Sequence, residues 1–164
     1  MAINFPTPTS VGQTFTNGSG ITWEWTGSSW KAFGQNASNL PTRQTVNFGG
    51  IVATQTGNEY YDVDINASTY TIHSITTNSN LWVRIYIDNQ SRTNDASRQI
   101  NVDPAPGIGL VCEVIKDNQI QVVTPGAVGY NNGYLKRFYV TVATLETSPV
   151  TASIDVVYQP LEPV

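Results

Sequence analysis

Three of the chain's four tryptophans, Trp23, Trp25 and Trp30, lie close together near the N-terminus. The residues around them are mostly Gly, Ser, Thr and Asn, with very few aliphatic side chains. A unit of about 30 residues buries too little surface for an ordinary core, and aromatic rings bury the most area per residue. We therefore expect a small N-terminal module whose core, or whose contact with a partner, is aromatic.

Three short strands are expected in this module, at Gln13–Thr16, Ile21–Trp25 and Ser29–Phe33. Turn signals separate them, first Asn17-Gly18 and then Thr26-Gly27-Ser28. Side chains alternate across a strand, so the two tryptophans of the second strand share one face.

The same residues resemble a small module of tailed-bacteriophage virion proteins, particularly those of phages that infect cyanobacteria. The resemblance is carried by Phe5, Pro6, Gly12, Gln13, Phe15, Gly20, Trp23, Trp25, Gly27 and Trp30. It implies a structural component of a virion.

The aromatic residues have three candidate roles: the core of the module, a contact with another protein, or stacking on sugar rings. Exposed Trp and Tyr are effective anchors at protein interfaces. The candidate residues for the core or the interface are Phe5, Trp23, Trp25, Trp30 and Phe33.

The domain organisation follows from composition. We expect the module with its N-terminal arm over residues 1–36, a polar linker over 37–44 and a second domain over 45–164.

Charged residues are only 12% of the chain, and Thr, Val, Ile, Asn and Gly are abundant. That bias favours an all-β protein with negligible helix.

The second domain shows period-2 alternation of apolar and polar residues, as in antiparallel sheets with one solvated face. We predict an antiparallel β-sandwich, with a barrel as the alternative. The expected strands are Thr45–Phe48, Ile51–Thr56, Glu59–Ile65, Thr69–Ser74, Leu81–Asp88, Leu110–Ile115, Ile120–Val123, Lys136–Leu145 and Thr151–Gln159.

Part of this domain is similar to a β-sandwich module of phage structural proteins, both tail-fibre-associated and virion-surface. The similarity is carried by Val83, Arg84, Tyr86, Arg92, Thr93, Asp95, Ala96, Ser97, Arg98, Ile100, Asp103 and Pro104. Pro125–Tyr130 and Val140–Leu145 extend it. The resemblance implies no catalytic residues.

The most prominent polar group is Arg92, Asp95 and Arg98, in the long segment Asn89–Gly109. Two arginines could hold an anionic ligand. The alternative is that Asp95 and Asp103 pair with the arginines and brace a loop that has no strand ladder, since long ordered loops need such support. We predict the brace.

Enzymatic chemistry is not expected. His73 is the only histidine and has no neighbouring Cys or Glu at ligand spacing, and Cys112 lies in an apolar run that predicts a small buried side chain. Asp62 and Asp64 alternate as on a solvated strand face. We expect no catalytic, cofactor-binding or metal site.

The formal net charge of −4 and the pI of about 4.7 disfavour binding to nucleic acid or anionic membranes, and no apolar run reaches transmembrane length. We expect a non-enzymatic decoration or cement protein on a phage capsid exterior. Its partners would be the major capsid protein, other virion proteins and further copies of itself. The alternative is a tail-fibre component that recognises a host cell-surface glycan.

Overall fold

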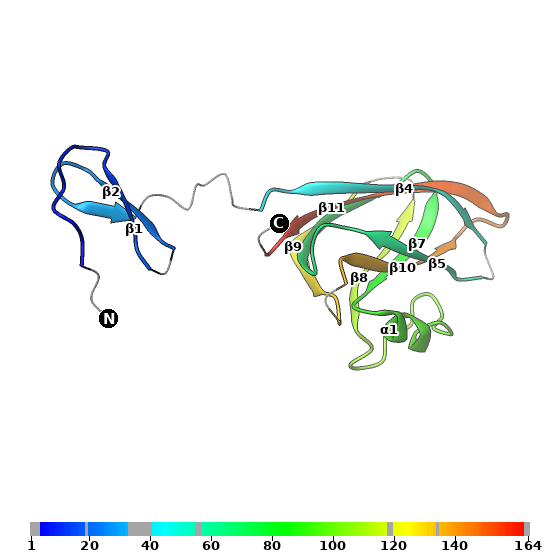
Figure 1. The fold of residues 1–164 in the computed structure, drawn as a ribbon. Coiled ribbons are helices and arrows are strands. Elements are labelled where there is room, and N and C mark those ends of the chain that lie inside the picture. Colours follow the sequence, from blue (N-terminus) through cyan, green and yellow to red (C-terminus); the bar gives the residue numbers. More distant parts are fainter. Residues whose placement is uncertain are drawn as a thin grey trace. The chain divides into compact units, whose positions relative to one another are not determined.

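The computed structural model describes residues 4–18, 20–32, 41–54, 57–117, 120–133 and 135–162. The chain forms two compact units, residues 1–40 and residues 41–164 (Figure 1). The predicted fold class is confirmed: the chain is 55% strand and 4% helix. We call the first unit the N-terminal module and the second unit the sandwich.

The N-terminal module is one antiparallel sheet with strand order β1-β2-β3. Its strands are β1 (Thr14–Thr16), β2 (Thr22–Trp25) and β3 (Trp30–Ala32). The turn signals close both connections. The Asn17 amide donates to the Ile21 carbonyl at 2.9 Å, and the Thr26 hydroxyl donates to the Ser29 carbonyl at 2.9 Å.

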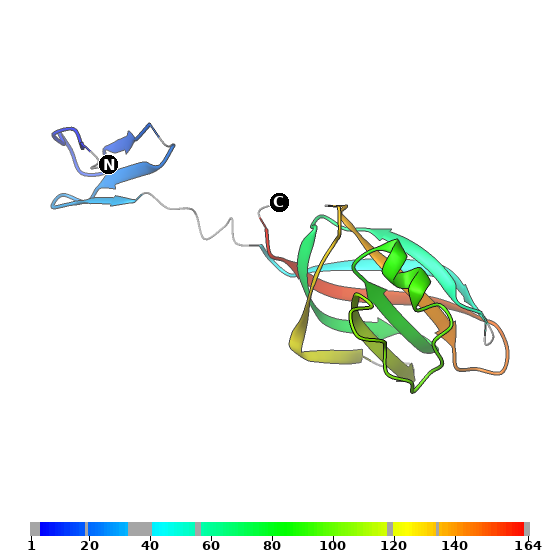
Figure 2. The ribbon, with the colours of Figure 1, turned by 90° about the horizontal axis from the view of Figure 1, so that it is seen from below.

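The sandwich contains two antiparallel four-stranded sheets, of order β5-β10-β7-β8 and β4-β11-β6-β9 (Figures 1 and 2). Their strands are β4 (Gln44–Ala53), β5 (Glu59–Asp64), β6 (Thr69–Thr77), β7 (Asn80–Tyr86), β8 (Leu110–Asp117), β9 (Ile120–Tyr130), β10 (Arg137–Thr144) and β11 (Val150–Pro160). One short helix, α1 (Asn89–Asn94), follows β7.

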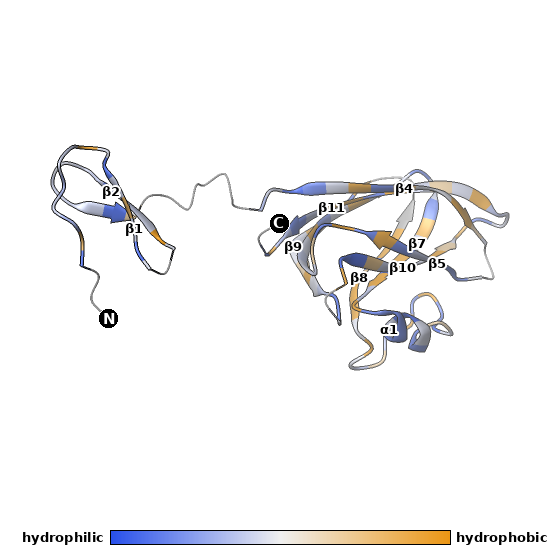
Figure 3. Cartoon of the chain, viewed as in Figure 1, coloured by the Kyte–Doolittle hydropathy of each residue, from blue (hydrophilic) through white to orange (hydrophobic). Residues whose placement is uncertain are grey.

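The hydrophobic core lies between these two sheets. Alternate residues of each strand enter it, and the same alternation is visible along β4 when the ribbon is coloured by hydropathy (Figure 3). Both sheets contribute fully buried side chains, including Ile51, Tyr70, Ile72, Ile75, Leu81, Val83, Ile85, Phe138, Val140, Ile154 and Val156.

Gly49-Gly50 does not separate two strands, so the predicted break there is wrong. β4 continues through both glycines as a bulge: Ile51 pairs with Ala152 and Phe48 with Ile154. Two residues therefore lie opposite one, and Gly50 adopts a φ of +69°. Glycine tolerates that left-handed conformation without a steric penalty.

β7 is buried on both faces, which contradicts the expected solvated face. Trp82, Arg84 and Tyr86 point away from the core and are 5%, 0% and 0% exposed. Helix α1 packs on β7 and β10, on the side of their sheet away from the core (Figures 1 and 2). The segment Asn89–Gly109, expected to be a loop, thus begins with a helix that covers this sheet.

The sandwich begins earlier than predicted. Gln44 is the first residue of β4 and pairs with Tyr158, and the Pro41 carbonyl accepts a 3.0 Å hydrogen bond from Gln159. The residues from Pro41 to Gln44 therefore belong to the sandwich and not to a linker. The rest of the predicted linker, residues 37–40, lies outside the described residues.

Candidate functional site

Two groups of side chains are candidates for function: a buried cluster of arginines and carboxylates under α1, and the aromatic face of the N-terminal module. The position of the buried cluster depends on where α1 begins. Asp88 caps the helix, since its Oδ1 accepts the Ser91 amide at 2.7 Å. Burial alone would raise the pKa of Asp88, but hydrogen bonds from Ser91 and Asn132 hold it below its ordinary value.

Asp95, at the C-terminal end of α1, is the centre of the buried cluster and is 4% exposed. Both of its carboxylate oxygens lie 2.9 Å from Arg98 Nε. Oδ2 also accepts a 2.6 Å hydrogen bond from the Tyr86 hydroxyl and lies 3.6 Å from Arg84 Nη1. One carboxylate thus serves two guanidinium groups and one phenol.

The segment Asn89–Gly109 lies over the outer side of β7, and we call it the covering segment. Arg84 extends from β7 to this segment and has no exposed surface. Its guanidinium lies 3.7 Å from the centre of the Trp82 ring, a cation–π contact, and donates to the side-chain oxygen of Asn58. It also donates to the Asp95 carbonyl at 3.3 Å. Asn58 in turn donates to the Ala96 carbonyl, which fastens the covering segment to the sheet.

Arg98 completes the cluster through β8. Its Nη1 lies 3.0 Å from Glu113, and its guanidinium is 5.2 Å from the centre of the Trp82 ring. Burial would lower the pKa of Arg98, but the hydrogen bonds and negative charges of Asp95 and Glu113 raise it above its ordinary value. Burial, and then the hydrogen bond to Asp95, raises the pKa of Tyr86.

Arg92 does not join Asp95, contrary to the predicted grouping. It reaches β5, where Nη1 lies 2.8 Å from Asp62 and donates to the Tyr61 carbonyl at 3.0 Å. Asn89 accepts a further 2.7 Å hydrogen bond from Arg92 Nη2. Asp103 is exposed and makes no ion pair among the described residues, so it is not the predicted second brace.

This arrangement is that of a structural brace. The guanidinium groups face carboxylates and carbonyls of the same chain, and the side chains of Arg84, Asp95 and Arg98 are at most 6% exposed. A groove of about 710 Å³ lies beside the cluster, lined in part by Trp82, Arg98 and Leu145. The charges that could attract an anion there are already neutralised by Asp95 and Glu113.

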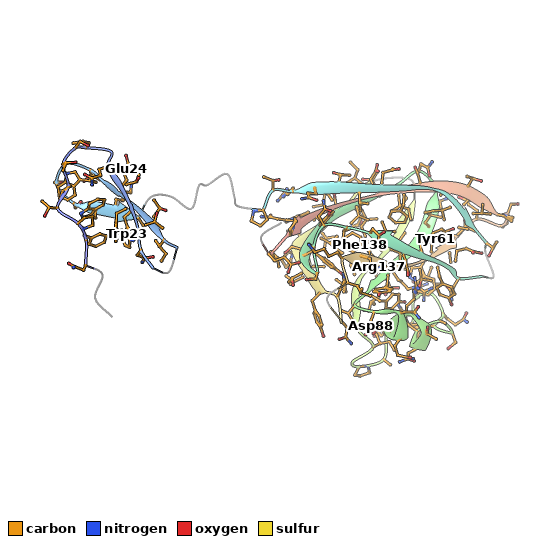
Figure 4. The ribbon with its side chains drawn as sticks, in the orientation of Figure 1. Trp23, Glu24, Tyr61, Asp88, Arg137 and Phe138 are labelled. Atoms are coloured by element: carbon orange, nitrogen blue, oxygen red, sulfur yellow. The ribbon has the colours of Figure 1, made fainter. Side chains whose placement is uncertain are left out.

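The aromatic face of the N-terminal module is built on cross-strand pairs. Phe15 pairs with Trp23, and Trp25 pairs with Trp30, so all four rings lie on one face. Glu24 is on the opposite face from Trp23 (Figure 4).

Phe5, from the N-terminal arm, lies across this face. Its ring stacks on Trp30 at 5.5 Å between centroids and meets Trp23 edge-on at 5.1 Å and Phe15 edge-on at 5.8 Å. Trp25 is at the margin of the group and contacts only the Trp30 ring among the described aromatic pairs, at 5.8 Å. Phe33 lies outside the described residues.

The aromatic face remains partly open to solvent. Phe5 and the three tryptophans are all half-buried, and none of the described residues of the module is fully buried. Among the residues that the structure describes, no second layer covers the rings apart from Phe5 of the N-terminal arm. These rings therefore keep solvent-exposed area that a partner could bury. They are not only a closed core of the module.

The histidine and the cysteine of the chain both lie in the sandwich. His73 is half-buried in β6. Cys112 is 8% exposed in β8, and burial raises the pKa of its thiol to about 11. The described residues contain no group of His, Cys, Asp or Glu that could hold a metal ion. No helix in the described ranges has the length and apolar character to cross a membrane.

Sequence reasoning did not assign Arg84, Asn58 and Glu113 to the cluster, or Asp62 to Arg92. A signal for Arg84 was present: it lies between Trp82 and Tyr86 on the outward face of a strong strand. Three large amphipathic side chains on that face indicate a covered surface rather than a solvated one. Asn58 and Glu113 come from distant segments and have no such local signal.

The fold and these two groups define a two-unit, all-β protein with an open aromatic face and a braced sandwich. In comparisons with known proteins, no family model and no curated protein matches the chain.

Proposed function

We propose that this chain is a non-enzymatic surface protein of a tailed-phage virion that decorates and stabilises the capsid shell. In this proposal the N-terminal module docks on the major capsid protein or a neighbouring virion protein, and the sandwich is the outward body. Binding of many copies stabilises an assembled shell by mass action.

The observation that carries the proposal is the open aromatic face. Four large aromatic side chains, Phe5, Trp23, Trp25 and Trp30, share one surface and are only half-buried. Trp residues supply much of the binding energy at protein interfaces when a partner excludes water from them. The described part of the module is one sheet, and a partner that covers this surface supplies a second layer.

The sandwich suits the role of a stable body. Its clustered charges form ion pairs within the chain, at Arg84–Asp95, Arg98–Glu113 and Arg92–Asp62. The resemblance of both units to modules of phage structural proteins supports the same class of function, and the net charge of −4 disfavours nucleic acid as the partner.

A tail-fibre component that binds a host glycan is the second candidate, and the margin of the aromatic face favours it. Trp25 has one described ring neighbour, which leaves its ring available for stacking on a sugar. The two functions differ in what the same face touches, namely a virion protein or a host polysaccharide.

The test is binding of the full chain to shells of the encoding phage that lack it, comparing Trp25→Ala with a matched control. The control, Glu24→Gln, changes the neighbouring residue on the opposite face. We expect Trp25→Ala to weaken shell binding by about 30-fold, as for an interface Trp worth about 2 kcal/mol, and Glu24→Gln to bind as the parent does.

Circular dichroism and thermal melting must show that both variants fold. Shell binding by Trp25→Ala at parental affinity contradicts the docking role. If that variant keeps shell binding and loses binding to host polysaccharide, the glycan function replaces it.

A further inference from the structure

The two sheets of the sandwich differ sharply in charge. In the sheet β4-β11-β6-β9 only Asp155 is charged, and its carboxylate accepts a 2.6 Å hydrogen bond from Asn47. The strands of the other sheet include the charged residues Glu59, Asp62, Asp64, Arg84, Glu113, Lys116, Asp117 and Arg137.

The uncharged sheet ends at an apolar edge strand. β9 pairs only with β6, so its other edge has no strand partner within its sheet. Four of its apolar side chains are largely exposed, and we call them the β9 patch: Ile120 (62%), Val122 (61%), Val128 (67%) and Tyr130 (55%). Exposed edges of natural proteins are protected by charges, prolines, bulges or short strands. β9 has Pro125 and a register shift between Val122 and Ala127, but no charge over its 11 residues.

The β9 patch continues onto its neighbours. Across the sheet, Val122 lies beside Ser74, which lies beside Val157, so small uncharged side chains extend the surface over β6 and β11. Around the edge, a groove of about 380 Å³ between β8 and β9 is lined in part by Ile115, which is 45% exposed, and by Glu113, which is paired with Arg98. Contiguous apolar surface of this kind marks interaction sites.

The charge distribution selects the partner. The only charged residues of the N-terminal module, Glu24 and Lys31, cancel, so the sandwich bears the whole net charge of −4. Two copies therefore repel each other, and this repulsion is weakest where the approaching surfaces carry no charge. On the β9 patch no like charges meet, and the carboxylate of the adjoining groove, Glu113, is already paired with Arg98 and does not attract a basic partner.

We propose that the β9 patch is a self-association surface that takes a second copy of this chain. The two copies meet along β9 about a two-fold axis, so that the exposed apolar rows of the two strands pack against each other. This inference does not depend on the shell-docking role of the N-terminal module.

The test is sedimentation of the full chain over a concentration series reaching about 100 μM, a range that detects micromolar affinity. The parent should dimerise. The double variant Val122→Glu/Val128→Glu sets like charges against each other at the contact and should weaken association by about 100-fold or more. The control is Val102→Glu, which introduces one glutamate, half the added charge of the double variant, at a similarly exposed position (52%) outside both sheets.

Hydrogen exchange of the parent adds a readout that does not need the variant to fold. Amides of β9 should become more protected as concentration rises. A parent that is monomeric throughout the series overturns the proposal. So does association that survives the double variant, or concentration-dependent protection confined to other strands. If the parent is monomeric and the double variant loses shell binding, the β9 patch contacts the shell instead.

Discussion

Removal of the Asp95 carboxylate should be the most damaging single polar change in the sandwich. Asp95 is 4% exposed and accepts hydrogen bonds from Arg98 and Tyr86 while facing Arg84. In Asp95→Ala the two guanidiniums and the phenol stay in place, because β7 and the covering segment hold them. Their charges and donors are then buried without a carboxylate between them.

The loss in the free energy of unfolding depends on which partners Arg84 and Arg98 keep in Asp95→Ala. Breaking a buried ion pair by removing one member costs about 3–5 kcal/mol. Arg98 keeps Glu113 at 3.0 Å, and Arg84 keeps Asn58 and the Trp82 ring. These remaining contacts place the expected loss toward the lower end, about 3 kcal/mol. Asp95→Asn keeps an acceptor for Tyr86 and should lose less.

The assay is urea denaturation at pH 7 followed by circular dichroism, with the slope against urea checked for constancy. The matched control is Asp103→Ala, which removes the same charge from an exposed site with no described ion pair. The control should change the free energy of unfolding by less than about 0.5 kcal/mol. Equal losses of under about 1 kcal/mol in both variants would refute the idea that Asp95 is a buried brace.

Three further measurements address other features. Asp88→Ala should cost about 1 kcal/mol through loss of the α1 cap. Because the folded-state pKa of Asp88 is lowered, its charge stabilises the fold above about pH 4, and this stabilisation is lost as the pH falls further. In urea denaturation between pH 5 and 3, Asp88→Asn should therefore lose less stability on acidification than the parent does. With a thiol pKa of about 11, Cys112 should react with iodoacetamide at pH 8 more than about 100-fold slower in the folded chain than in urea, and equal rates would contradict its burial. Gly50→Ala should cost about 1–2 kcal/mol from the left-handed φ alone, since a Cβ there meets no atom within 4 Å; Gly49→Ala, where φ is not positive, should cost less.

The strands were largely predictable because the core is built from a local pattern. In β7, alternate residues Leu81, Val83 and Ile85 enter the core, as their spacing indicates. The same rule located most strands of both units to within a few residues. Burial of one sheet face imposes that pattern wherever a strand lies, so a short window of sequence carries it.

The errors arose where a distant segment decides the local structure. Gly49-Gly50 permits either a turn or a bulge, and pairing with β11, about one hundred residues away in the chain, selects the bulge. β9 likewise extends past its predicted end at Val123, because β6 resumes pairing with it at Ala127. Neither outcome is encoded in the few residues concerned.

The candidate sites divide in the same way. Asp95 and Arg98 are three residues apart, so their ion pair was accessible to local reasoning. The partners Arg84 and Glu113 come from β7 and β8, and only the packing of the covering segment brings them to the cluster. The shared face of Trp23 and Trp25 followed from strand alternation. The cross-strand ring pairs Phe15–Trp23 and Trp25–Trp30, and the placement of Phe5 over them, were not predicted.

The shell proposal is tested most directly by a density map of the intact virion of the encoding phage. The proposal predicts copies of the sandwich over the outer surface of the head, each joined to the shell through density that fits the N-terminal module with its aromatic face covered. Density for this chain at the tail vertex alone, or a virion that contains no copy of it, would contradict the proposal.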